Sequence, residues 1–160
     1  MPNSEYDQLA VEVAREQIAH LAPQELPLFR PLSAAYLKDP DNALRRRSGR
    51  DEMLGLGPDV AAAFVTPVVL AVSQGVLQFL AEDIKKSYGV EGSAPVTAIL
   101  RKLFRRPGPD NSDDTTPRLS PAQLQQVHQL ALEKARLLDL PEPQARLLAE
   151  SLTGGLAVSP

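Results

Sequence analysis

Residues 60–81 read VAAAFVTPVVLAVSQGVLQFLA, a stretch without a single charged side chain. Its apolar residues recur at helical spacing, and the pattern continues to Ile84, which predicts one long helix over residues 58–87. Gly89 follows as the expected helix terminator, while Pro67 is expected to kink the helix or split it in two. Because valine is frequent, a β-hairpin that turns at the central Ser-Gln-Gly is the alternative.

Amphipathic patterns on both sides of this segment predict further helices, which makes the chain all-α. These helices are expected at residues 4–21, 31–38, 93–106, 120–138 and 142–152. The Arg-rich stretch between residues 41 and 57 is expected to be a loop with at most one helical turn at Ala43–Arg47. The fold class is therefore a small helical bundle that ends in a helical hairpin.

The chain divides by composition into three parts. Residues 1–106 form a helical body that contains the long apolar helix. Residues 107–119, PGPDNSDDTTPRL, have almost nothing to bury and are expected to be a polar linker. Residues 120–160 form the hairpin, opened by Ser120 and Gln123 at capping-box spacing. A hairpin of this size is too small to be stable alone, so it must pack on the body, on its own copy or on a partner.

The composition excludes several classes of function. The chain has no cysteine, which removes disulfides, thiolate catalysis and cysteine-bound metals. The net charge of −3 selects no partner. The N-terminus is acidic and amphipathic and does not resemble a secretory signal, which favours a cytoplasmic location, with membrane association left open.

No set of residues points to catalysis. His20 and His128 have no partner at ligand or triad spacing, and the Gly55–Pro58 loop does not match a nucleotide-binding fingerprint. Three acidic pairs, Asp51/Glu52, Glu82/Asp83 and Asp113/Asp114, are expected to be solvated. We therefore expect no enzyme, no catalytic residue, no cofactor and no metal.

The uncharged helix is open to three interpretations: a core helix, a membrane-inserting helix or a partner-binding helix. In the last two, one apolar face would contact the membrane or the partner. That face consists of Val65, Val68, Val72, Val76, Phe79 and Leu80.

Two local basic patches stand out in this slightly acidic chain. They consist of Arg45, Arg46, Arg47 and Arg50, and of Arg101, Lys102, Arg105 and Arg106. The second patch ends the amphipathic helix 95–106 and is expected either to satisfy its own helix end or to contact an anionic membrane surface. Nucleic acid is the weakest partner, because aromatic stacking residues are scarce and the hairpin's second helix carries only Arg146.

The sequence thus predicts a non-enzymatic interaction protein, an adaptor or effector-type module, that binds a protein partner or itself. The hairpin would dock through Leu124, Val127, Ala131, Leu148 and Leu152. Membrane association through helix 58–87 and the basic helix is the alternative. A helix-turn-helix regulator that binds nucleic acid is the third and weakest possibility.

Overall fold

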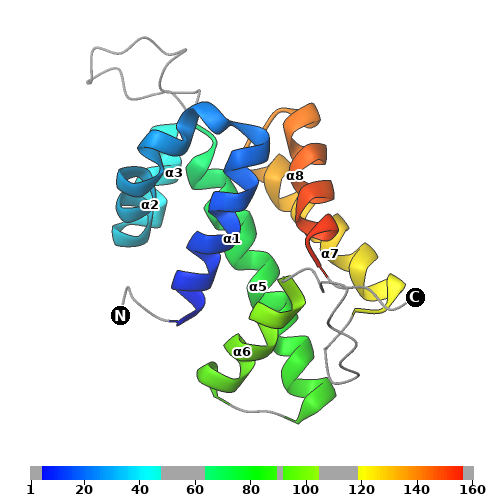
Figure 1. The fold of residues 1–160 in the computed structure, drawn as a ribbon. Coiled ribbons are helices and arrows are strands. Elements are labelled where there is room, and N and C mark those ends of the chain that lie inside the picture. The colour runs from blue at the N-terminus through cyan, green and yellow to red at the C-terminus, as the bar shows by residue number, and fades with distance from the viewer. Residues whose placement is uncertain (1–4, 48–63, 90–91, 105–118, 157–160) are drawn as a thin grey trace, which may run out of the picture.

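The computed structural model describes residues 5–47, 64–89, 92–104 and 119–156. In these ranges every secondary-structure element is a helix. The prediction of an all-α fold is confirmed (Figure 1). The elements are α1 (Glu5–Leu21), a 3₁₀ helix η1 (Pro23–Leu28), α2 (Phe29–Lys38), α3 (Pro40–Arg47), α5 (Thr66–Tyr88), α6 (Ser93–Phe104), α7 (Pro121–Leu137) and α8 (Glu142–Gly154).

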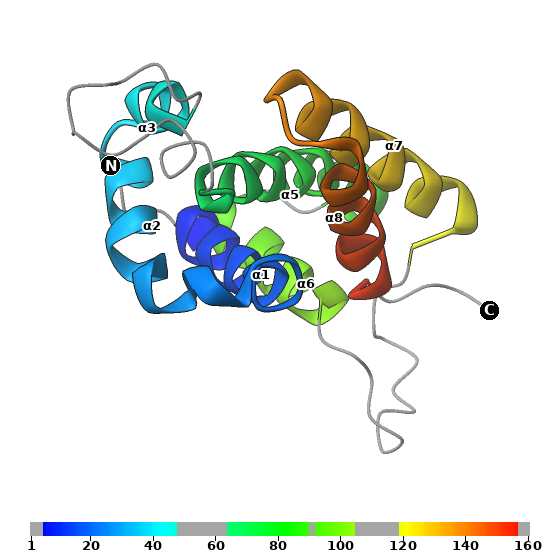
Figure 2. The same cartoon turned by 90° about the horizontal axis from the view of Figure 1, so that it is seen from above.

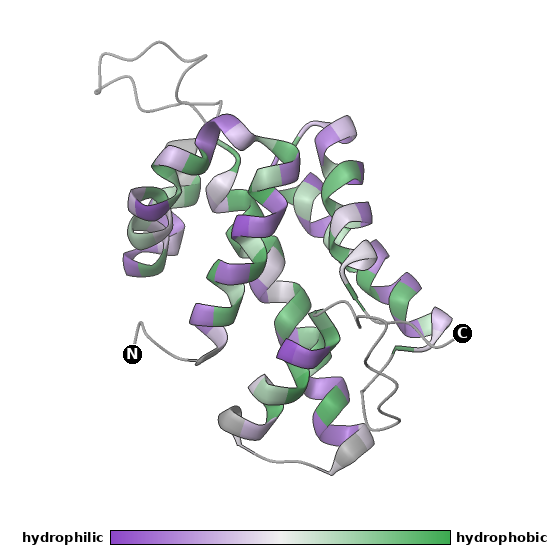
Figure 3. Cartoon of the chain, viewed as in Figure 1, coloured by the Kyte–Doolittle hydropathy of each residue, from purple (hydrophilic) through white to green (hydrophobic). Residues whose placement is uncertain are grey.

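Helix α5, which contains most of the uncharged stretch, is the central element. It packs against α1, α2, α3, α6 and α7 (Figures 1 and 2). The hydropathy colouring in Figure 3 shows why, because hydrophobic residues continue along much of its length. A helix that is apolar over most of its surface must be covered nearly all round, and the neighbouring helices supply that cover.

The C-terminal pair α7 and α8 packs on the rest of the protein and on itself. α7 contacts α8 and α5, and α1 contacts α8 and α5. The four helices therefore form a ring in which each helix contacts the next. Figure 2 shows this arrangement from above, with α6 beneath α1 and with α2 and α3 at the far side of α1 from α8. The hairpin therefore supplies one wall of the hydrophobic core.

The long helix begins later than the sequence suggests. It starts at Thr66, and Pro67 lies in its first turn, where a proline fits because the missing N–H would have no helical partner. The expected kink at Pro67 is therefore wrong, and so is the β-hairpin alternative. Residues 58–63 lie outside the described ranges. Gly89 ends the helix in the left-handed conformation, as predicted.

A buried glutamate fixes the start of α5. Glu25, in η1, is only 3% exposed. Its carboxylate accepts hydrogen bonds from the backbone N–H of Val65 at 2.9 and 3.1 Å and from that of Thr66 at 3.1 Å. It also accepts one from the Thr66 hydroxyl at 2.7 Å. A carboxylate here satisfies N–H groups that the helix cannot pair itself and complements the helix dipole.

Local signals define the hairpin. The capping box is confirmed: Ser120 Oγ accepts from the Gln123 N–H at 3.1 Å, and Gln123 Oε1 accepts from the Ser120 N–H at 2.8 Å. α7 ends in a Schellman motif, because the Leu140 N–H reaches the Ala135 carbonyl and Asp139 has a φ of 63°. A positive φ is unusual for aspartate, and glycine would normally occupy this position.

Candidate functional site

The apolar face proposed for a membrane or partner lies inside the protein. Five of its six residues, Val65, Val68, Val72, Val76 and Leu80, are at most 3% exposed. Phe79 is half-buried and packs against the core. In this arrangement the face is covered by the chain's own helices and offers no open surface.

Within the described residues, one helical segment, Thr66–Ser87, is long and apolar enough to cross a bilayer by length and composition. In the structure, 72% of that window is buried. The core helix of a globular protein meets the same criteria, since it also needs an unbroken apolar surface.

The hairpin residues expected to dock on a partner instead pack internally. Val127, Ala131, Leu148 and Leu152 are fully buried, and Leu124 is half-buried against the core. Their hydrophobic stripe is therefore what joins α7 and α8 to each other and to the body of the protein.

The basic patches are only partly described. Arg101 forms an ion pair with Glu12 of α1, with Nη1 2.8 Å from Oε2, and Lys102 is exposed. Arg50, Arg105 and Arg106 lie outside the described residues, as do the side chains of Arg45, Arg46 and Arg47. Within the described part, the second patch therefore has one cation already engaged and one free to face solvent.

The two histidines lie on different helices. His20 is exposed near the end of α1, and His128 is half-buried on α7. In the described part of the chain, no group of three or more His, Asp or Glu side chains is placed to hold a metal. Asp83 accepts a hydrogen bond from Gln123, while Glu82 pairs with Lys85. The Gly55–Pro58 loop and the pairs Asp51/Glu52 and Asp113/Asp114 lie outside the described residues.

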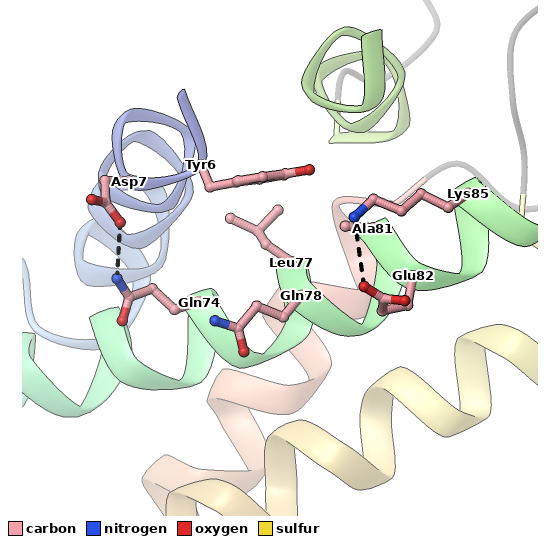
Figure 4. A pocket seen from close by; sticks show the side chains of 8 residues that line it. All are labelled: Tyr6, Asp7, Gln74, Leu77, Gln78, Ala81, Glu82 and Lys85. Atoms are coloured by element: carbon pink, nitrogen blue, oxygen red, sulfur yellow. Dashed lines mark hydrogen bonds and ion pairs between the residues drawn. The ribbon is translucent and has the colours of Figure 1, made fainter. Parts of the chain in front are cut away.

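A groove of about 420 Å³ lies between the start of α1 and the middle of α5 (Figure 4). Its centre is apolar, where the Tyr6 ring faces Leu77, with Ala81 one turn further along α5. Its polar ends are largely internally paired. At one end Gln74 Nε2 donates to Asp7 at 3.3 Å. At the other, Lys85 Nζ lies 3.6 Å from Glu82 Oε1. The volume suits a small ligand, but most of the polar groups already satisfy one another.

The groove's polar end continues inward to a buried tyrosine. The Tyr36 hydroxyl donates to Gln74 Oε1 at 2.6 Å, so a chain of hydrogen bonds links α2, α5 and α1. Burial, together with the negative charges of Asp7 and Asp41, raises the pKa of Tyr36 to about 12. The phenol therefore remains protonated at neutral pH and acts as a fixed donor. These hydrogen bonds are thus a structural connection between α2, α5 and α1.

The outer side of α7 carries the most exposed large hydrophobic residue of the described chain. Leu137 is 82% exposed. Leu130, one heptad earlier, is half-buried and, among the described residues, is not part of the hydrophobic core cluster. Gln126 and Glu133 are exposed and lie on the same stripe, because positions 126, 130, 133 and 137 follow helical spacing. We call these four residues the α7 outer face.

The N-terminal half of α7 is uncharged. From Pro121 to Leu132 the helix carries no Asp, Glu, Lys or Arg, and its exposed positions there include Gln125, Gln126 and Gln129. Exposed helix surfaces normally carry charges, whereas the centres of protein interfaces are depleted of them. The part of the α7 outer face up to Leu130 therefore has the composition of a contact surface, and Glu133 lies beside it.

Sequence reasoning missed this face because the hydrophobic stripe of α7 drew attention to its buried side. The available signal was that Leu130 and Leu137 fall off that stripe while keeping a spacing of seven residues. Sequence reasoning also missed the Glu25 clamp and the Tyr36–Gln74 bond. These pair residues 38 to 41 positions apart, for which one sequence carries no signal.

Comparisons with protein-family models, with curated proteins and with solved structures find no match for this chain.

Proposed function

We propose that this chain is a non-enzymatic helical interaction protein, and that its α7 outer face binds another protein. The observation that carries the proposal is the 82% exposure of Leu137, the last residue of α7, with the half-buried Leu130 one heptad earlier. Full burial of an exposed leucine side chain contributes about 1.5–3 kcal/mol. A partner that covers Leu137 would therefore gain up to about 3 kcal/mol from this side chain without disturbing the fold.

The face is available because other sides of α7 hold the hairpin in place. Val127, Ala131 and Ala135 face the core, and the Lys134 side chain lies against Gly75 of α5. The outer face is not needed for that packing. A partner can therefore bind the folded chain as it stands.

Truncation of residues 107–160 is a poor test of this proposal. Leu148 and Leu152 are fully buried, and α7 and α8 cover α5 and α1. Their removal would expose the core, and any loss of assembly would then follow from unfolding and not from the missing binding surface. A change confined to the outer face avoids this problem.

Site-specific photo-crosslinking in cells tests the proposal directly. A photoreactive benzoylphenylalanine replaces Leu137 in the full chain, and a matched variant carries it at Glu150, an exposed position of α8. We expect a discrete protein adduct from position 137, identified by mass spectrometry, and none of that mass from position 150. Equal adducts at the two positions, or none at position 137, would overturn the proposal.

A second candidate is binding to anionic membranes, supported by the apolar character of Thr66–Ser87 and the exposed Lys102 of α6. It requires α5 to leave the core. The test is flotation with phosphatidylserine vesicles, in which replacement of the four cations of the second basic patch by glutamine should weaken binding. A chain that stays with the soluble fraction excludes this role.

A further inference from the structure

We infer that the partner of the α7 outer face is a second copy of this chain, bound with the two α7 helices side by side and parallel. The inference rests on the proposed function, because it names the occupant of the same face. It is carried by the charges that flank the exposed Leu137 and the half-buried Leu130.

Two opposite charges border the leucine stripe on its two sides. With about 100° of rotation per residue, Glu133 and Lys134 lie about 50° to either side of the line from Leu130 to Leu137. Glu133 accepts a hydrogen bond from Gln129 at 3.2 Å, and the Lys134 side chain folds over Gly75. Within the described residues neither takes part in an ion pair.

The symmetry of a pair of copies decides which flanks meet. When two identical helices run parallel about a two-fold axis, the left flank of one faces the right flank of the other. Glu133 then faces Lys134 of the second copy once the Lys134 ammonium turns away from Gly75 of α5, and the contact occurs twice. In an antiparallel pair the same flanks meet, so Glu133 would face Glu133 and Lys134 would face Lys134. The charge pattern is therefore complementary to itself only in the parallel arrangement.

The parallel arrangement also places each leucine of the α7 outer face on its own equivalent. Leu130 packs on Leu130 and Leu137 on Leu137 across the axis, one heptad apart, which is the spacing of a short coiled-coil contact. The uncharged glutamines of the first turns of α7 lie beside this contact. The surface is small, below the roughly 1,200 Å² of a standard interface, so we expect a reversible dimer with a dissociation constant on the order of 100 μM.

Sedimentation velocity of the purified full chain, from about 10 μM to about 1 mM, measures this equilibrium. We expect a monomer–dimer transition in the wild type. Leu137→Glu should weaken it at least about tenfold, because a buried like-charge pair replaces the leucine contact. Leu147→Glu is the matched control, since Leu147 is exposed on α8 away from the α7 outer face, and it should leave the transition unchanged.

Charge reversal tests the orientation. Glu133→Lys and Lys134→Glu should each weaken the dimer about three- to tenfold, and the double reversal should restore it to within about twofold. Circular dichroism of each variant confirms that the helices are retained. A disulfide between two copies of a Leu137→Cys chain, formed on mild oxidation and absent for Leu147→Cys, is the expected independent signature, because the native chain has no cysteine.

Three outcomes overturn the inference. The first is a wild type that stays monomeric at about 1 mM. The second is a dimer that Leu137→Glu leaves intact. The third is a dimer that neither single charge reversal weakens, which indicates antiparallel pairing, because a reversed flank then still meets its own equivalent. If position 137 crosslinks a different protein in cells while the purified chain stays monomeric, the proposed function stands and the self-association inference fails.

Discussion

Replacing Glu25 by alanine should destabilise the protein more than any other single change of a charged residue in the described chain. The substitution leaves the backbone N–H groups of Val65 and Thr66 and the Thr66 hydroxyl without their acceptor in a buried site. Each buried donor left without an acceptor lowers the free energy of unfolding by about 1–3 kcal/mol. Removal of the carboxylate also relieves the desolvation of a charge, so we expect a net loss of about 3 kcal/mol in the free energy of unfolding.

Glu25→Gln separates the charge from the hydrogen bonds. Its amide oxygen can keep the three bonds made by Oε1, but its NH₂ group would face the Val65 N–H, which Oε2 now accepts at 2.9 Å. We expect a smaller loss of about 1–2 kcal/mol.

Urea unfolding followed by circular dichroism at 222 nm measures both effects on the Glu25 clamp, with Glu150→Ala on the exposed side of α8 as the control. The alanine variant should also melt roughly 6–12 °C lower than the wild type. A Glu25→Ala chain within about 0.5 kcal/mol of the control would refute the reasoning, because it would mean that the start of α5 does not depend on this carboxylate.

Three further changes test the packing. Tyr36→Phe should lose about 1 kcal/mol with the hydrogen bond to Gln74. The pKa of Tyr36 in the folded protein is raised to about 12 from 10.0, so its contribution to stability is fully present below pH 10 and is lost as the pH rises through 12. Absorbance titration at 295 nm should show that this tyrosine ionises at about pH 12. Gly75→Ala should stabilise α5 by about 0.5 kcal/mol in urea unfolding, since the close Lys134 ammonium, 2.9 Å from the new Cβ, is the mobile end of its side chain. Asp139→Gly should raise the unfolding free energy by about 0.5–1 kcal/mol because φ is 63° there; no gain would contradict the assigned backbone.

Much of the fold was predictable because its signals are local. The helical spacing that runs to Ile84 identified α5, Gly89 marked its end, and Ser120 with Gln123 marked the start of α7. Each of these features depends on residues within a few positions of one another. The predicted start of α5 was wrong, because the true start depends on Glu25, which lies 40 residues before Val65 in the chain.

The candidate site was less predictable for a related reason. The apolar run over residues 60–81 indicates only that something must cover the helix, and the sequence does not state whether this is a membrane, a partner or the chain itself. The structure assigns that role to the neighbouring helices, which bury Val68, Val72 and Val76 completely. What remains exposed, Leu137 above all, becomes recognisable only when the buried side of α7 is known.

Thiol labelling at position 137 tests most directly whether the α7 outer face contacts another protein. Because the native chain has no cysteine, a Leu137→Cys variant reports on this position alone. We expect a maleimide to react rapidly with the dilute purified variant, as 82% exposure of the leucine implies, and at least about tenfold more slowly when the same variant is labelled in intact cells. A Glu150→Cys chain should react at the same rate in both settings. Equal rates for Leu137→Cys in dilute solution and in cells would contradict the account, because they would show that nothing covers the face.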